Sequence, residues 1–200
     1  MISKREYYQN QKASQPFDFK FLGNLDITLI LKNLNTFTEE QWNEHTHRNE
    51  DFRAHNHTNS LEILWDKDSL ATGLTGAKNK INYKQLDFDY IKNLLQPIYD
   101  KHYGPGYFIR VLIPRLNPGS SIPIHRDNGK SLMEVKRTHI PLITNENIIF
   151  KVGDTTKNLK AGEVWEINNG REHAVNNNSD EYRIHLIVDY LPKNYYIYNK

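Results

Sequence analysis

Short apolar runs separated by turn residues fill the chain after Gly104-Pro105-Gly106. Runs of this kind, rich in β-branched and aromatic residues, are typical of β-strands joined by tight turns. They cover residues 107–114, 122–125, 138–143, 147–152, 163–167, 173–176 and 182–190. Turn signals stand between them, among them Asn117-Pro118-Gly119 and Asn168-Asn169-Gly170. Many short strands at such spacing favour a sandwich or a barrel.

The first half of the chain has a different pattern. From Asp87 to Tyr99 apolar residues return at helical spacing, which predicts an amphipathic helix. Thr38 followed by Gln41 forms a capping-box signature and predicts a short helix. We also expect a strand over residues 60–65, and an extended piece leading into a helix or strand over residues 17–34. The first dozen residues are polar, and we expect them to be poorly ordered.

These patterns together predict a mainly β protein with N-terminal helices, built as one integrated domain. Residues 1–104 form a mixed helical and strand region that supports the rest. Residues 105–200 form a double-sheet β-barrel packed on that region. A chain of 200 residues is the right length for one such domain.

Composition and charge narrow the possible functions. The 26 basic and 24 acidic residues are interspersed and leave a net charge of +2, without the basic stripe of a nucleic-acid binder. The absence of cysteine excludes disulfides, zinc ribbons and thiol catalysis, so a metal site must use His and carboxylate ligands. No apolar run approaches the roughly 18 residues that span a bilayer, and no signal-peptide core follows Met1. We therefore expect a cytoplasmic protein that binds neither nucleic acid nor membrane.

His125 and Asp127 are separated by one residue in a strand-like run. Residues two apart in an extended chain point to the same side, so both can bind one metal ion. His173, from a later run, can supply a third ligand. Two His and one carboxylate are the ligand set of non-haem Fe(II) oxygenases, because this set leaves positions open for substrates and dioxygen. The competing interpretation is a chance His-x-Asp sequence in a surface turn.

Two further strands carry polar residues at period two. Arg137 shares a face with His139, and Arg183 shares one with His185 and Asp189. Arginine suits an anionic co-substrate beside the metal, because its planar guanidinium binds a carboxylate through two parallel hydrogen bonds. Arg183 follows His173 closely enough for a hairpin to return it towards the metal. The alternative for Arg183 is a surface arginine paired with a carboxylate such as Asp189 or Glu181.

These motifs resemble the aspartyl/asparaginyl β-hydroxylase family, which includes free-proline cis-hydroxylases. The resemblance covers about residues 108–192 and rests on segments in the expected order. The segments are His125-Arg126-Asp127, Arg137-Thr138-His139-Ile140-Pro141-Leu142, Gly162-Glu163-Val164-Trp165, His173-Ala174-Val175-Asn176-Asn177 and Arg183-Ile184-His185-Leu186-Ile187-Val188-Asp189.

The resemblance implies a double-stranded β-helix, also called a jelly roll and similar to cupins, with Fe(II) as metal and 2-oxoglutarate as co-substrate. It implies that His125 and His173 bind iron, and that Arg183 grips the distal carboxylate of 2-oxoglutarate. Arg137 and His139 match positions that contact the co-substrate. The animal aspartyl hydroxylase lacks a carboxylate ligand, whereas Asp127 is present here, as in the proline-hydroxylase branch. The expected reaction is hydroxylation of an amino acid resembling Asp, Asn or Pro, free or peptidyl, by dioxygen.

The sequence signals for substrate contacts are weaker than those for the metal and co-substrate residues. Arg53 and His55 could reach over the barrel mouth, and Arg126 points away from its two ligand neighbours. Trp165 could contact substrate or fill the core. Two His-x-His pairs, His45 with His47 and His55 with His57, favour a solvated loop over a second metal site. Two other functions stay open: a cupin-like metalloenzyme that does not use 2-oxoglutarate, and a non-catalytic β-sandwich binding module.

Overall fold

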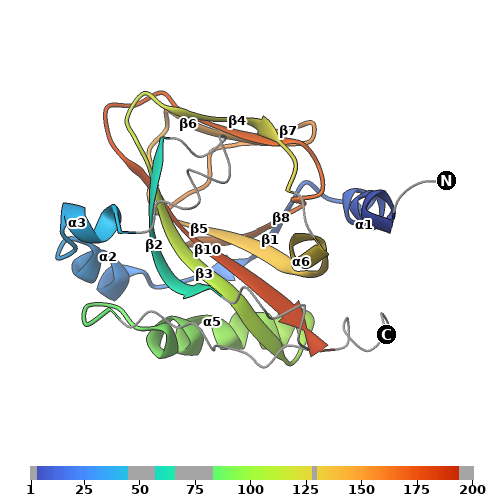
Figure 1. Cartoon of the computed structure of the whole chain (residues 1–200), viewed down its shortest axis with the longest axis horizontal. Coiled ribbons are helices and arrows are strands. Elements are labelled where there is room, and N and C mark those ends of the chain that lie inside the picture. Colours follow the sequence, from blue (N-terminus) through green and yellow to red (C-terminus); the bar gives the residue numbers. More distant parts are fainter. Residues whose placement is uncertain (1–3, 45–56, 66–82, 128–129, 194–200) are drawn as a thin grey trace.

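The computed structural model describes residues 4–44, 57–65, 83–127 and 130–193, which form two facing antiparallel sheets (Figure 1). The larger sheet has the strand order β1 (Phe19–Asn24), β8 (Glu163–Ile167), β5 (Lys136–Ile143), β10 (Arg183–Pro192), β3 (Gly106–Leu116) and β2 (Thr58–Trp65). The smaller sheet has the order β4 (Ser121–His125), β9 (His173–Asn177), β6 (Ile148–Val152) and β7 (Thr155–Lys157). The predicted mainly β, jelly-roll fold class is confirmed.

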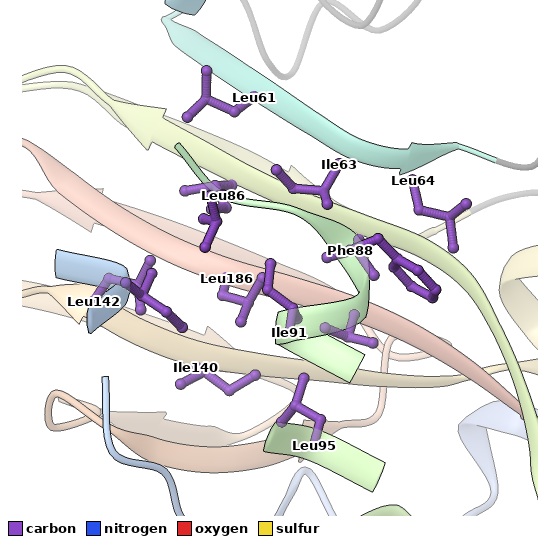
Figure 2. Close-up of a cluster of buried hydrophobic side chains, with 14 of the residues drawn as sticks. Leu61, Ile63, Leu64, Leu86, Phe88, Ile91, Leu95, Ile140, Leu142 and Leu186 are labelled. Atoms are coloured by element: carbon purple, nitrogen blue, oxygen red, sulfur yellow. The ribbon is translucent and has the colours of Figure 1, made fainter. Parts of the chain in front are cut away.

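Helix α5 (Phe88–Tyr103) covers the outer face of the larger sheet (Figure 1). Asp87 caps its first turn by accepting a hydrogen bond from the Tyr90 backbone N–H at 2.7 Å. The predicted apolar stripe of this helix buries Ile91 and Leu95 against Ile140 and other residues of the sheet (Figure 2). This layer makes the larger sheet a rigid base for the site on its other face.

Helices α2 (Thr28–Leu34) and α3 (Glu39–Trp42) add to the same core. The predicted capping box is confirmed, because the Thr38 hydroxyl accepts from the Gln41 N–H and the Gln41 side chain accepts from the Thr38 N–H. A second core cluster joins the two sheets. Its members are Leu116, Ile122, Phe150, Val152, Leu159, Ile167 and Val175.

The expectation that the first dozen residues are poorly ordered is wrong from Lys4 onward, where α1 (Lys4–Ala13) forms. The buried Lys12 ammonium donates to the Val135 carbonyl at 2.7 Å, and the Arg171 Nε–H donates to the Ala13 carbonyl at 2.9 Å. These contacts are tertiary, so local polarity could not reveal them. Sequence patterns also missed β7 and the short helix α6 (Lys130–Glu134). None of the helices in the described residues is both long enough and apolar enough to cross a bilayer.

Candidate metal and co-substrate site

The three predicted ligands meet at one end of the smaller sheet. His125 ends β4 and His173 begins β9, and the two residues are paired in register, with ring centroids 4.2 Å apart. Asp127 follows β4, and its Oδ1 lies 3.8 Å from His173 Nε2. One ligand atom from each residue lies within 4.8 Å of the other two. This donor set fits a divalent metal bound on one face, with positions left for other ligands.

Both histidines are oriented by their own strands. His125 Nδ1 lies 2.8 Å from the Pro123 carbonyl oxygen, and His173 Nδ1 lies 3.0 Å from that of Arg171. A carbonyl only accepts, so each Nδ1 carries a proton, and in the neutral form of each ring Nε2 then keeps its lone pair. Burial lowers the pKa of His173 below the usual range, which keeps this ring neutral at pH 7. The rings are thus prepared to bind a metal through Nε2.

Asp127 is held through only one of its two oxygens. Its Oδ2 accepts hydrogen bonds from Arg137 Nη1 at 2.7 Å and from Asn169 Nδ2 at 2.9 Å. Its Oδ1 faces His173 and remains available to a metal. Burial alone would raise the pKa of Asp127, but the charge of Arg137, the His173 ring and the Asn169 hydrogen bond together lower it. The carboxylate is therefore ionised at neutral pH.

The ligands line a cavity between the two sheets, and His139, Phe150 and Arg183 line the same cavity. Arg183 is 2% exposed, and its guanidinium lies over the Phe150 ring, 5.4 Å from the centroid. Its Nη2 donates to His185 Nδ1 at 3.0 Å, while its Nε has no hydrogen-bond partner among the described residues. Burial lowers its pKa to about 9, so the group still carries its charge at neutral pH.

Arg183 does not form the ion pair with Asp189 or Glu181 that was the alternative from sequence. Asp189 instead accepts hydrogen bonds from Arg110 and Arg137. In the described part of the chain, no carboxylate pairs with Arg183. A buried, uncompensated cation of this kind is costly, so it marks a place where an anion can bind.

His139 lies beside Arg183 in the same cavity. Burial and the charge of Arg183 hold the pKa of His139 well below the usual range, so its ring is neutral. Its Nδ1 has no hydrogen-bond partner within the described ranges. Burial and Arg183 also lower the pKa of His185, whose ring lies 5.8 Å from that of His139. Two neutral imidazoles can therefore adapt their hydrogen bonds to a ligand next to Arg183.

Two of the weaker candidates, Arg126 and Trp165, lie outside the metal cavity. Arg126 is exposed, with Nη2 3.5 Å from Glu172 Oε1 at a surface hollow away from the ligands. The Trp165 ring packs against Phe19 and Phe21, with centroids 6.3 and 5.1 Å away. Neither residue lines the metal cavity. The other substrate candidates, residues 53 and 55, lie outside the described residues, as do His45 and His47.

Two site residues have roles that the sequence pattern does not predict. Asn169 belongs to a turn signal in the sequence, yet its amide donates both to Asp127 and to the Leu132 carbonyl at 3.0 Å. Asp189 is a candidate partner for Arg183 in the sequence, yet it accepts hydrogen bonds from Arg137. The alternation of polar residues along β10 places Asp189 on the same face as Arg183 and His185. It does not show which residue of the neighbouring strand Asp189 contacts.

Two facing antiparallel sheets with a largely buried His–Asp–His cluster between them define an oxygenase-type jelly roll. More specifically, the chain belongs to the aspartyl/asparaginyl β-hydroxylase family, whose family model matches residues 26–192. No curated protein matches the sequence.

Several solved structures share the fold. One is an oxidoreductase of the 2OG-Fe(II) oxygenase family from Burkholderia pseudomallei, with 15% identity, 96% of this chain and 91% of that chain covered, and a TM-score of 0.62. Another is a prolyl hydroxylase from Trichoplax adhaerens in complex with a hypoxia inducible factor peptide fragment, with 12% identity, coverages of 98% and 94%, and a TM-score of 0.60. A nickel complex of the non-haem monooxygenase ThoJ has 12% identity, coverages of 92% and 77%, and a TM-score of 0.52. At such identities the likeness shows the fold alone.

Proposed function

We propose that this chain is an Fe(II)- and 2-oxoglutarate-dependent oxygenase that hydroxylates an amino acid, free or within a peptide. The observation that carries the proposal is one cavity that holds two complementary features. Its lining includes the three metal ligands and the buried Arg183, which has no carboxylate partner in the described residues. A small dicarboxylate that also chelates a metal would match both features at once.

His125, Asp127 and His173 would hold the Fe(II). When bound, Fe(II) with 2-oxoglutarate and dioxygen supplies the oxidising chemistry that yields succinate, carbon dioxide and a hydroxylated substrate. The chain contributes geometry: two rings fixed by backbone carbonyls and one carboxylate oxygen kept free. The apolar cavity wall, which includes Leu116, excludes water from the reacting centre.

Arg183 would grip the distal carboxylate of 2-oxoglutarate through its guanidinium N–H groups. The cost of burying this charge is then offset only when the ligand is present, which favours an anion over a neutral molecule. His139, neutral and lacking a partner for Nδ1, would complete the contacts to the co-substrate. Arg137 donates through Nε, Nη1 and Nη2 to two carboxylates, so we assign it to orienting Asp127.

The proposed substrate is an amino acid in a class that includes Asp, Asn and Pro. Membership of a hydroxylase family supports hydroxylation, and the prolyl hydroxylase that shares the fold is bound to a peptide. Arg53 and His55 remain proposed substrate contacts. Arg126 and Trp165 are not included, because they lie outside the cavity.

The direct test of this function is succinate formation from 2-oxoglutarate in the presence of Fe(II) and air, with panels of free amino acids and short peptides. We expect a slow succinate release without substrate, which the right substrate accelerates. His173→Ala removes a ligand and should abolish the release. His57→Ala is the matched control, because His57 is exposed and outside the cavity.

The competing functions give different results. A cupin-like metalloenzyme that does not use 2-oxoglutarate would bind iron, but its activity would be indifferent to Arg183→Met. A non-catalytic binding module would bind no iron, and its ligand binding would survive His125→Ala. Either result would overturn the proposed function.

A further inference from the structure

Two buried charged residues and the partly buried Arg137 form a row across the larger sheet. Arg137 on β5, Asp189 on β10 and Arg110 on β3 lie on adjacent strands, and Asp189 is the register partner of both arginines. Asp189 is 0% exposed. Arg137, at one end of the row, also donates a hydrogen bond to the metal ligand Asp127.

The hydrogen bonds divide the guanidinium of Arg137 between two carboxylates. Asp189 Oδ1 accepts from Arg137 Nε at 2.8 Å, and Asp189 Oδ2 accepts from Arg137 Nη2 at 2.8 Å. Arg110 Nη1 donates to the same Oδ2 at 2.8 Å. Only Nη1 of Arg137 reaches Asp127, and it binds the oxygen that does not face His173.

We propose that Asp189 is a positioning residue for the metal site, which keeps Asp127 Oδ1 free by engaging the bidentate edge of Arg137. The inference rests on the proposed function, because it concerns how that same site is kept ready for Fe(II). Nothing in the family match or the related structures assigns this role.

Asp127 and Asp189 compete for the guanidinium of Arg137. Arginine and a carboxylate favour a two-point contact through parallel N–H groups. In the native arrangement Asp189 takes that contact, so Arg137 offers Asp127 a single donor. Without a carboxylate at 189, Arg137 can turn its two-point contact to Asp127 and cover both oxygens. The metal would then have to displace a buried ion pair to reach Oδ1.

Asp189 is charged in the native protein, as the argument requires. Burial alone would raise its pKa, but Arg137 and Arg110, through charge and hydrogen bonds, lower it. Arg110 also lies over the Trp65 ring, 5.4 Å from the centroid, which fixes the outer end of the row. The row is therefore anchored on β2 and ends at the metal ligand.

The test is anaerobic Fe(II) titration of the whole protein, without 2-oxoglutarate or substrate, for the wild type and Asp189→Asn. Asparagine has nearly the same shape but only one acceptor oxygen, so it cannot hold both donors of Arg137. We expect Fe(II) affinity to fall by about 10- to 100-fold, as is usual when a partner of a metal ligand is lost.

Glu166→Gln is the matched control. Glu166 is a buried carboxylate on β8, which accepts from Tyr103 at 2.6 Å and pairs with Lys136 at 3.6 Å. Losing its charge should destabilise the fold without changing Fe(II) affinity. An equal loss of affinity in this control would show a general effect of buried charge and would overturn the role of Asp189.

A double-mutant cycle shows whether Asp189 acts through Arg137. In an Arg137→Met background there is no guanidinium to release, so Asp189→Asn should leave Fe(II) affinity unchanged. If Asp189→Asn alone does not fold, Arg110→Met/Asp189→Asn removes one charge of each sign and carries the same expectation of weakened binding.

The outcomes separate the two proposals. Two results would overturn the positioning role and leave the proposed function standing. In the first, the Asp189 variants bind Fe(II) with the affinity of the wild type. In the second, Asp189→Asn still weakens Fe(II) binding in the Arg137→Met background. A wild type that binds no Fe(II) overturns the proposed function, and the positioning role with it.

Discussion

Two arginines of one cavity differ in their partners: Arg137 is shared by two buried carboxylates, whereas Arg183 has none within the described part of the chain. Burial by itself lowers the pKa of both groups. At Arg137 the charges of Asp127 and Asp189 more than reverse this, and its pKa is raised. At Arg183 burial acts alone and lowers the pKa to about 9.

This difference assigns different roles to the two arginines. Arg137 has a structural role, because carboxylates of the folded protein match its charge and accept its hydrogen bonds. Arg183 has a charge that a bound ligand must match. A protein that only needed stability would pair or remove Arg183, so the cost of keeping it points to use in binding.

The largest effect on stability is expected from the replacement of Arg137. Arg137→Met leaves Asp127 without its charge partner and Asp189 with one arginine instead of two. Breaking a buried ion pair in this way should lower the free energy of unfolding of the metal-free protein by about 3–5 kcal/mol. Urea unfolding followed by circular dichroism measures this. A loss below about 1 kcal/mol, the size expected for an exposed ion pair, would contradict the structural role of Arg137.

Arg183→Met should separate binding from stability. The metal-free protein should be as stable as the wild type or more so, because an uncompensated buried cation is removed. Affinity for 2-oxoglutarate should fall by about 10- to 100-fold, the worth of the lost charge-assisted hydrogen bonds. Calorimetric titration of the Fe(II)-loaded protein under argon gives the affinity.

Arg126→Met is the control for this variant, since Arg126 is exposed and outside the cavity. It should change neither quantity. Strong destabilisation by Arg183→Met together with normal 2-oxoglutarate binding would mean that Arg183 has a structural role and no role in binding.

Asn169→Ala should have a smaller effect, on metal affinity. It removes one donor to Asp127 Oδ2 but leaves Arg137 in place, so we expect Fe(II) binding to weaken by about tenfold. Asn168→Ala is the matched control, because the Asn168 amide donates to Phe17 and other backbone carbonyls of the N-terminal segment, not to a ligand. Equal effects of the two variants on Fe(II) affinity would exclude a specific role for Asn169.

The smallest effect is a dependence of stability on pH from the histidines near Arg183. The pKa values of His139 and His185 lie well below 6.5 in the folded protein, so protons bind to the unfolded chain first as the pH falls. Stability of the metal-free protein should therefore decrease below pH 6.5, by about 1 kcal/mol for each histidine per pH unit. Urea unfolding at pH 7.5, 6.5 and 5.5 measures the slope, which His139→Gln should reduce. A slope of the opposite sign would mean that these rings are protonated when folded.

Periodicity predicted much of this structure. The alternation of apolar and polar residues in the second half of the chain predicted the strands. The two-residue spacing of His125 and Asp127 predicted that both side chains point to one side, and in the structure they cluster with His173. The helix α1 could not be predicted, because its stability depends on contacts of Lys12 and Ala13 with residues more than a hundred positions away. Local propensity carries no information on such contacts.

The interior of the site was predictable only in part. Polar period two indicated that Arg137 and Arg183 face a common cavity, but not that one is paired and the other is not. That distinction depends on register, which sets Asp189 directly opposite Arg137 and Arg110. Asn169 followed a turn signal, and only the closing of the β8–β9 connection brings its amide to Asp127.

We propose that one cavity holds Fe(II) at His125, Asp127 and His173 and 2-oxoglutarate at Arg183. The most direct measurement is anaerobic addition of Fe(II) and then 2-oxoglutarate, followed by the weak visible charge-transfer band of the chelate. We expect the band in the wild type only when both are present, no band in His173→Ala, and a band that needs more 2-oxoglutarate in Arg183→Met. A band that survives unchanged in His173→Ala would show that His173 is not an iron ligand.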